Sequence, residues 1–186
     1  MALSTLYILN DFRYNKNNIK ENSMNKIEKD ILALIAEDSR LTAKKMAAML
    51  GIEESKVMQT VSALEAAGTI VKYTAILNTD SVDDESVEAL IEVKVTPQRG
   101  HGFDMIANEI ASHEEVKNLY LMSGAYDLAV IVQGKSLRNV SRFVSEKIST
   151  YDTVISTATH FILKKYKVEG AIMRKNNTPE RLSIQA

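Results

Sequence analysis

The hydrophobic residues of this chain change their spacing part-way along it, and this change limits the possible folds more than any other feature. Ile27, Ile31 and Leu34 recur at intervals of four and three residues, which is typical of one face of an α-helix. In the segment VEALIEVKV, residues 87–95, apolar and charged side chains mostly alternate instead, as they do in a half-buried strand. The sequence therefore predicts a helical N-terminal part and a mixed C-terminal part.

The N-terminal part predicts three short helices. Asn25 and Glu28 have the spacing of a capping box at the start of the first helix. Thr42 offers an N-cap to the second helix, and Gly51 suits the left-handed backbone that ends it. In the third helix we expect a buried stripe that includes Val57. A tight turn between the last two helices is typical of a helix-turn-helix, although an ordinary three-helix packing unit has the same spacing.

The C-terminal part predicts the order βαββαβ. After the strand at 87–95 come a helix at about 103–110, a hairpin with its turn at 123–125, a helix capped by Ser136 and a last strand at about 153–163. This is the ferredoxin-like split unit, an antiparallel sheet with both helices on one face.

Apolar side chains are predicted on both faces of that sheet, although its two helices can cover only one. We expect the uncovered face to carry Leu90, Leu119, Leu121 and Phe161. A second copy of the chain in a symmetric dimer would cover it. A tolerated exposed apolar face is the alternative.

Composition excludes several other classes of protein. The chain has no cysteine, so it has no disulfide and no thiolate metal site, and a reducing cytoplasm suits it. No apolar run approaches the roughly 20 residues of a membrane span, and the N-terminus lacks the pattern of a secretory signal. We expect a cytoplasmic protein with no membrane partner. The net charge of −1 means that any binding to nucleic acid must come from a local patch.

The order and spacing of these segments resemble the Lrp/AsnC family, the leucine-responsive or feast/famine regulators of transcription. The resemblance covers about residues 24–170, and it is carried by the stretches DILALIAEDSRLTAKKMAAMLGI, LEAAGTIVKYTAILN, SGAYDLAV and TATHFIL. It implies an α+β fold, with an N-terminal winged-type helix-turn-helix and a C-terminal ferredoxin-like βαββαβ domain of the type that regulates amino-acid metabolism. It also implies double-stranded DNA as partner, an amino acid or related small molecule as effector, and a homodimer or octamer whose linking strands pair across the two-fold axis.

The resulting division of the chain has five parts. They are a flexible N-terminal extension at 1–23, rich in asparagine and followed by a second methionine; the helix-turn-helix at 24–69; a linker strand at 70–86; the ferredoxin-like ligand-sensing and oligomerisation domain at 87–170; and a C-terminal tail at 171–186.

The third helix is the candidate recognition helix, the helix that would contact the bases of DNA. We expect the phosphate contacts to come from Lys44, Lys45 and Lys56, and the base contacts from Ser55, Gln59, Thr60 and Ser62. The family usually places several basic residues on this helix, and here most of those positions are uncharged. Residues 24–73 contain seven basic and seven acidic side chains, so a single copy should bind DNA weakly. Either multivalency in an oligomer restores the affinity, or the chain is a ligand-sensing or partner-binding subunit whose DNA binding is weak or lost.

The stretch SGAYDLAV is the candidate effector site. By resemblance to the family its turn lines a pocket between dimers, so Ser123, Gly124, Tyr126 and Asp127 are candidate contacts for the carboxylate and ammonium groups of an amino acid. Thr157 and Thr159, which share one face of the last strand, are further candidates. The alternative interpretation is structural: Asp127 caps the hairpin and Gly124 makes its turn.

An enzyme is the competing class, and the motifs for one are absent. The three histidines have no metal-ligand spacing, and there is no G-x-S-x-G, no phosphate-binding loop and no cysteine nucleophile. We therefore expect no catalytic residues, no metal and no cofactor. RNA binding on the sheet would favour aromatic side chains, whereas leucines dominate the face predicted to be open.

Overall fold

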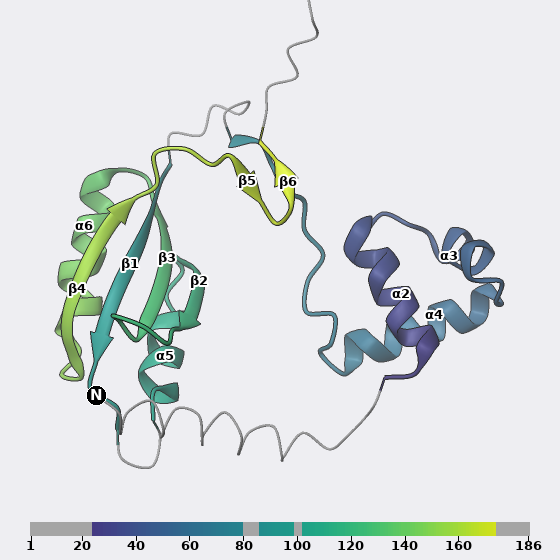
Figure 1. Cartoon of the computed structure of the whole chain (residues 1–186), viewed down its shortest axis with the longest axis horizontal. Coiled ribbons are helices and arrows are strands. Elements are labelled where there is room, and N and C mark those ends of the chain that lie inside the picture. The colour runs from purple at the N-terminus through teal and green to yellow at the C-terminus, as the bar shows by residue number, and fades with distance from the viewer. Residues whose placement is uncertain (1–23, 80–85, 99–101, 174–186) are drawn as a thin grey trace, which may run out of the picture. The chain divides into compact units, whose positions relative to one another are not determined.

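The computed structural model describes residues 24–79, 86–98 and 102–173. The chain divides into two compact units, at 1–75 and 76–186, and each is described by itself (Figure 1). The predicted flexible extension at 1–23 lies outside the described residues, as does the tail from 174 onward.

The first unit contains the three predicted helices: α2 (Lys26–Glu37), α3 (Ala43–Leu50) and α4 (Glu54–Ala66). The capping box is present, because the Asn25 side chain accepts from the Glu28 backbone N–H at 2.9 Å and the Glu28 carboxylate accepts from the Asn25 N–H at 2.8 Å. The Thr42 side chain caps α3. Gly51 ends that helix at φ 65°, a left-handed conformation that glycine adopts without a Cβ clash. The predicted helix starts and turn are confirmed.

Apolar side chains from all three helices form the core of this unit. Its fully or almost fully buried members are Ile31, Met46, Ala47 and Val57. Residues at intervals of three and four along each helix meet at this point, because such residues share one helical face. The packing places the opposite face of α4 in solvent.

The segment after α4 has no regular secondary structure at residues 71–78 in the single chain. A β-strand needs a partner strand to pair with, and residues 80–85 lie outside the described part. The linker strand at 70–86 therefore stays a prediction.

The second unit has a four-stranded antiparallel sheet with two α-helices. Its elements are β1 (Val87–Val95), α5 (Asp104–Ala111), β2 (Val116–Leu121), β3 (Leu128–Gly134), α6 (Leu137–Glu146), the 3-10 helix η2 (Ile148–Thr150) and β4 (Val154–Phe161). The strand order is β2-β3-β1-β4, with every neighbouring pair antiparallel. The predicted ferredoxin-like βαββαβ order is confirmed.

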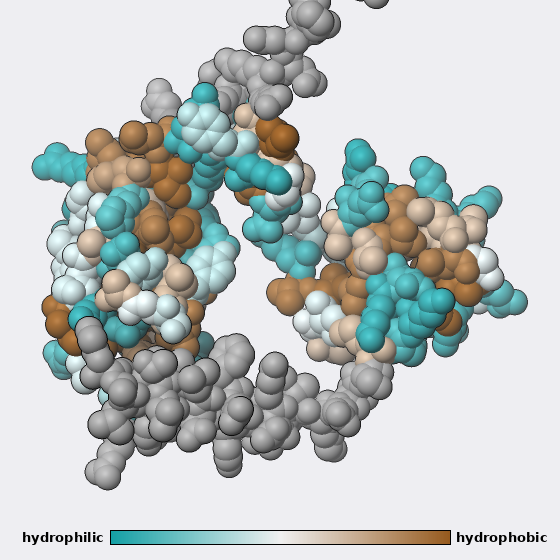
Figure 2. Space-filling model, in the orientation of Figure 1, coloured by the Kyte–Doolittle hydropathy of each residue, from teal (hydrophilic) through white to brown (hydrophobic). Residues whose placement is uncertain are grey.

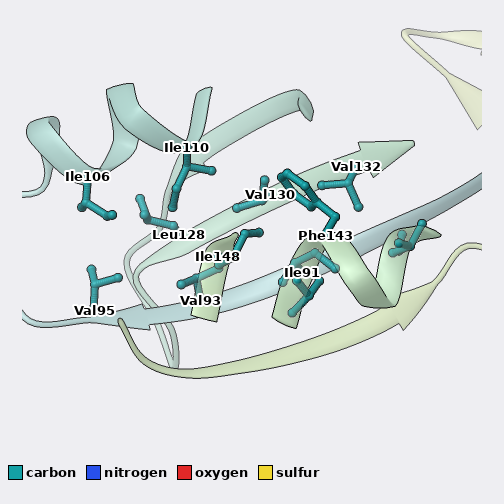
Figure 3. Close-up of a cluster of buried hydrophobic side chains, with 13 residues drawn as sticks. Ile91, Val93, Val95, Ile106, Ile110, Leu128, Val130, Val132, Phe143 and Ile148 are labelled. Atoms are coloured by element: carbon teal, nitrogen blue, oxygen red, sulfur yellow. The ribbon is translucent and has the colours of Figure 1, made fainter. Parts of the chain in front are cut away.

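The core of this unit lies between the sheet and its helices (Figure 3). Ile106 and Ile110 of α5 and Phe143 of α6 pack over sheet residues such as Ile91 and Val130. Gly134 brings the end of β3 close to α6, because a Cβ built on Gly134 would lie 3.0 Å from Cγ2 of Val140.

The prediction for the uncovered face of the sheet is largely wrong. Leu119 and Phe161 pack against the core beneath the helices. Leu121 is the cross-strand partner of the buried Leu128 and therefore lies on the same, helix-covered face of the sheet. Of the predicted four, Leu90 alone pairs with residues on the other face, Ile131 and His160. The physical reason is register: alternation gives two faces within each strand, but pairing decides which face of one strand continues that of the next.

One element was not expected. After β4 the chain forms a short hairpin of β5 (Lys167–Val168) and β6 (Ala171–Ile172), which is separate from the main sheet. Its turn places Glu169 at φ 44° and Gly170 at φ 83°, the left-handed pair of conformations that a two-residue hairpin turn requires.

Candidate functional site

The exposed face of α4 carries polar side chains. Ser55, Lys56, Gln59 and Ser62 are exposed there, because the buried positions of the helix, such as Val57, occupy its opposite face. Two hydroxyls and an amide beside a lysine can donate to or accept from base edges. The helix therefore presents the groups that its predicted role needs.

Thr60 does not belong to that face, and the prediction that it faces outward is wrong. The side chain is 9% exposed, and its hydroxyl donates to the backbone carbonyl of Lys56 at 2.8 Å. Thr60 follows Val57 by three residues and precedes Leu64 by four, so it lies on the apolar stripe. The bond to the preceding turn satisfies the hydroxyl there.

Positive charge near this face is limited. Lys44 and Lys45 are exposed in the first turn of α3, but Glu53 and Glu54 stand at the start of α4. Arg40 forms an ion pair with Asp38 at 3.0 Å, and hydrogen bonds from Arg40 lower the pKa of the Asp38 carboxyl. Arg40 is thus matched by a neighbouring carboxylate in its own unit.

The β2–β3 connection holds the candidate effector residues on one loop. Ser123 and Gly124 are exposed at its tip, and Tyr126 and Asp127 are half-buried at its base. A Cβ built on Gly124 meets nothing within 4 Å, so the loop has open space at this point.

Asp127 is a structural residue of that loop. Its backbone N–H donates to the carbonyl of Val93 at 3.1 Å, and its carbonyl accepts from the N–H of Met122 at 2.7 Å. Its Oδ2 accepts from the N–H of Val95 at 2.9 Å, two residues beyond Val93, where the pairing of β1 with β3 ends. The side chain thus supplies a hydrogen bond just beyond the end of that ladder, as the structural interpretation predicts.

Thr157 and Thr159 lie on β4, away from this loop. Thr157 pairs with Val93 and Thr159 with Ile91, while β3 pairs along the other edge of β1. One strand therefore separates the threonines from the strand that carries Asp127, a spacing of about 10 Å between the outer strands. The two sets of candidates therefore lie on elements that β1 separates.

The described histidines have neighbours within the protein. Nε2 of His160 lies 3.4 Å from a carboxylate oxygen of Glu92. Nε2 of His113 lies 3.1 Å from the Tyr151 hydroxyl, and its ring meets Phe143 edge-on at 5.4 Å. His101 falls outside the described residues. Among the residues that are described, no three His, Asp or Glu side chains cluster as metal ligands would.

None of the helices in the described ranges has the length and apolar content that crossing a membrane requires.

Comparison with known proteins identifies both units. Residues 24–71 match winged helix-turn-helix DNA-binding domains, and residues 88–172 match the Lrp/AsnC ligand binding domain. An HTH-type transcriptional regulator of Bacillus subtilis, YugG, is 44% identical over 158 residues, which cover 84% of this chain and 95% of that protein. The chain belongs to the Lrp/AsnC family.

Solved structures of Lrp/AsnC-type regulators share the fold. Escherichia coli AsnC superposes with a TM-score of 0.59 at 18% identity, covering 78% of this chain and 95% of that one. A transcriptional regulator of Neisseria meningitidis, solved in complex with L-Met, superposes with a TM-score of 0.62 at 23% identity, covering 78% of this chain and 94% of that one. This Lrp/AsnC chain is thus a DNA-binding transcriptional regulator with a ligand-binding domain.

Proposed function

We propose that the protein binds specific DNA sequences through α4 and changes its activity when an amino acid or related metabolite binds its C-terminal domain. It acts as a homodimer or higher oligomer in the cytoplasm and catalyses no reaction. The observation that carries the proposal is the exposed polar face of α4, on a helix whose other face is anchored in the core by Val57 and Leu64.

In this proposal the contacts to DNA divide by chemistry. Lys44, Lys45 and Lys56 bind phosphates, which position the domain but carry little sequence information. Gln59 reads a base edge, because its amide can donate to and accept from adenine at once. Ser55 and Ser62 add single hydrogen bonds on either side of it.

For the effector, we propose that the β2–β3 loop binds the polar end of an amino acid. Backbone groups at Ser123 and Gly124 bind the carboxylate, the half-buried Tyr126 ring contacts the side chain, and the Asp127 carboxylate binds the ammonium group. The L-Met complex of the Neisseria regulator, which has the same fold, supports this class of ligand. Thr157 and Thr159 lie on β4, across β1 from the strand that follows Asp127, and they are the second set of candidate contacts for the effector.

Self-association is supported by apolar side chains that one chain leaves exposed. In the segment after α4, Val71 is 88% exposed and Leu77 is 65% exposed, and Figure 2 shows hydrophobic residues at the surface of both units. A second copy is the simplest partner, because a two-fold axis brings the same apolar surface together twice.

A titration with DNA tests the proposal. Fluorescence anisotropy with a duplex from the region upstream of its own gene, and with a duplex of random sequence, should show tighter binding to the first. Gln59→Ala should lose about 1–3 kcal/mol on the first duplex and little on the second. Lys56→Gln should weaken binding to both. Lys29→Gln, an exposed lysine on α2, is the matched control.

The alternative is a ligand-sensing subunit of the same fold whose DNA binding is weak or lost. The equal numbers of acidic and basic side chains in residues 24–73 favour it. Absence of binding to either duplex at 50 mM salt would leave this alternative in place of the proposal.

Calorimetry with a panel of amino acids tests the effector site. Asp127→Asn is the informative variant, because an amide keeps an oxygen for the Val95 N–H but removes the charge that an ammonium group needs. We expect one class of amino acid to bind the parent and to bind Asp127→Asn at least tenfold more weakly. Asp152→Asn, an exposed carboxylate, is the control, and equal binding by all three proteins would remove Asp127 from the site.

A further inference from the structure

A cavity of about 510 Å³ lies in the second unit, between helix α6 and the connection from α5 to β2. Its floor is apolar: Val132 of β3 and Val140 and Phe143 of α6 line it, and each is at most 5% exposed. Pockets for small molecules usually have volumes of about 300–1,000 Å³ and a mainly apolar lining with a few polar groups. The cavity therefore has the size and the floor that a small metabolite needs.

Hydrogen bonds and ring contacts fix the two walls of this cavity. The N–H of Gln133 donates to the carbonyl of Glu115 at 2.9 Å, which attaches the α5–β2 connection to the end of β3. On the other side, Nε2 of His113 lies 3.1 Å from the Tyr151 hydroxyl, and the His113 ring meets Phe143 of α6 edge-on. The fold alone thus forms the cavity, as is usual for small-molecule sites.

The cavity is separate from the β2–β3 loop. Asp127 immediately precedes β3, whereas the cavity is lined by the other end of that strand, up to Gly134. A strand rises about 3.3 Å per residue, so Gly134 lies roughly 20 Å from Asp127. The described residues that line the cavity include none of the candidate contacts for the effector.

The rim of the cavity carries acidic side chains on one wall and basic side chains on the other. Arg142 and Glu146 of α6 form an ion pair with each other at 3.2 Å, so together they add no net charge. Four further exposed side chains at the rim form no ion pair with any residue that the structure describes: Glu114 and Glu115 on the α5–β2 connection, and Lys135 and Lys147 just after β3 and α6.

We propose that this cavity binds a small zwitterion whose ammonium and carboxylate groups stand at opposite ends of an apolar chain, as in an ω-amino acid or a dipeptide. Glu114 and Glu115 bind the ammonium group, Lys135 and Lys147 bind the carboxylate, and the apolar chain covers the floor. An α-amino acid fits less well, because it carries both charges on one carbon atom. This site goes beyond the proposed function and does not depend on it.

Calorimetry with the full chain tests the proposal. The probes are 6-aminohexanoate and L-leucylglycine, which represent the two sources of such a zwitterion, and hexanoate and hexylamine, which carry one charge each. At least one zwitterion should bind at millimolar concentration, and both singly charged compounds should bind more weakly than it does. Lys135→Gln/Lys147→Gln and Glu114→Gln/Glu115→Gln should each weaken binding of that zwitterion on the order of fivefold, as expected for partly exposed ion pairs.

Two controls separate this site from the rest of the surface. Lys94→Gln/Lys167→Gln removes the same charge at two exposed lysines outside the cavity and should bind the zwitterion as the parent does. Asp127→Asn should also bind it as the parent does, because it alters only the β2–β3 loop.

Three results would overturn the proposal: no binding of either zwitterion, equal binding by the parent and both cavity variants, or weaker binding by Asp127→Asn, which would place the probe at the loop. None of them bears on DNA binding by α4, and the first two leave the effector site as proposed.

Discussion

Replacing Asp127 separates its structural role from its proposed role toward an effector. Its Oδ2 accepts a 2.9 Å hydrogen bond from the N–H of Val95, a residue that is 3% exposed. Asp127→Ala removes the acceptor and leaves this backbone N–H in the protein interior without a hydrogen bond. Asp127→Asn replaces the carboxylate oxygen with an amide oxygen of nearly the same position.

The expected magnitude follows from the cost of a buried, unpaired donor. Leaving such a group unsatisfied costs about 1–3 kcal/mol, so we expect Asp127→Ala to lower the free energy of unfolding of the C-terminal unit by about 2 kcal/mol. For a unit of this size that corresponds to a fall in melting temperature of about 8–10 °C. Asp127→Asn should lose under about 1 kcal/mol, since a neutral hydrogen bond replaces a charged one.

Thermal unfolding followed by far-UV circular dichroism, without any effector present, measures these differences. Asp152→Ala, which removes an exposed carboxylate, controls for the change in net charge and should melt with the parent. If Asp127→Ala also melts with the parent, then the bond to Val95 does not stabilise the loop and the structural account of Asp127 is wrong.

Three further substitutions test other parts of the account. Gly134→Ala should destabilise the C-terminal unit by about 1–3 kcal/mol, because its Cβ would lie 3.0 Å from Val140; Gly124→Ala, whose Cβ meets nothing within 4 Å, should unfold with the parent, and urea denaturation compares the two. Asn25→Ala removes the capping box of α2 and should cost the first unit about 1 kcal/mol in the same assay; an unchanged midpoint would show that the cap contributes nothing. The Tyr73 hydroxyl donates a hydrogen bond to the Glu65 carboxylate of α4, and this bond raises the pKa of Tyr73 above 10.0. The bond therefore stabilises the folded protein below pH 10, and this stabilisation is lost as the hydroxyl ionises at higher pH. Tyr73→Phe should therefore melt below the parent at pH 8, with the gap closing toward pH 11, and a gap that persists at pH 11 would contradict this.

The sequence was most informative where a local rule decides the structure. Asn25, Thr42 and Gly51 act through hydrogen bonds and backbone angles within a few residues of themselves, so their spacing alone predicts where helices begin and end. The βαββαβ order was predictable for the same reason, because each strand and helix has its own period.

Features that depend on distant residues were not predictable in this way. The face of Leu119 and Phe161 depends on strand pairing across the sheet, which alternation within one strand does not specify. Thr60 was misplaced because its hydroxyl bonds back to Lys56, so a polar side chain occupies an apolar position. The β5–β6 hairpin has two residues in each strand, too few for any period to appear.

The role of Asp127 was open for a different reason. A carboxylate after a glycine turn is equally consistent with a cap and with a ligand contact, and the backbone N–H that Asp127 binds is 32 residues away in sequence, on β1. Only the fold brings these two groups together.

The proposed function requires that a recognition helix with little net charge binds DNA because several copies of the chain bind together. Multi-angle light scattering of the purified full-length chain, from about 1 to 50 micromolar and without DNA, tests this most directly. The account predicts a molar mass of at least twice the 20.7 kDa of one chain throughout that range. A constant mass of one chain at every concentration would contradict it.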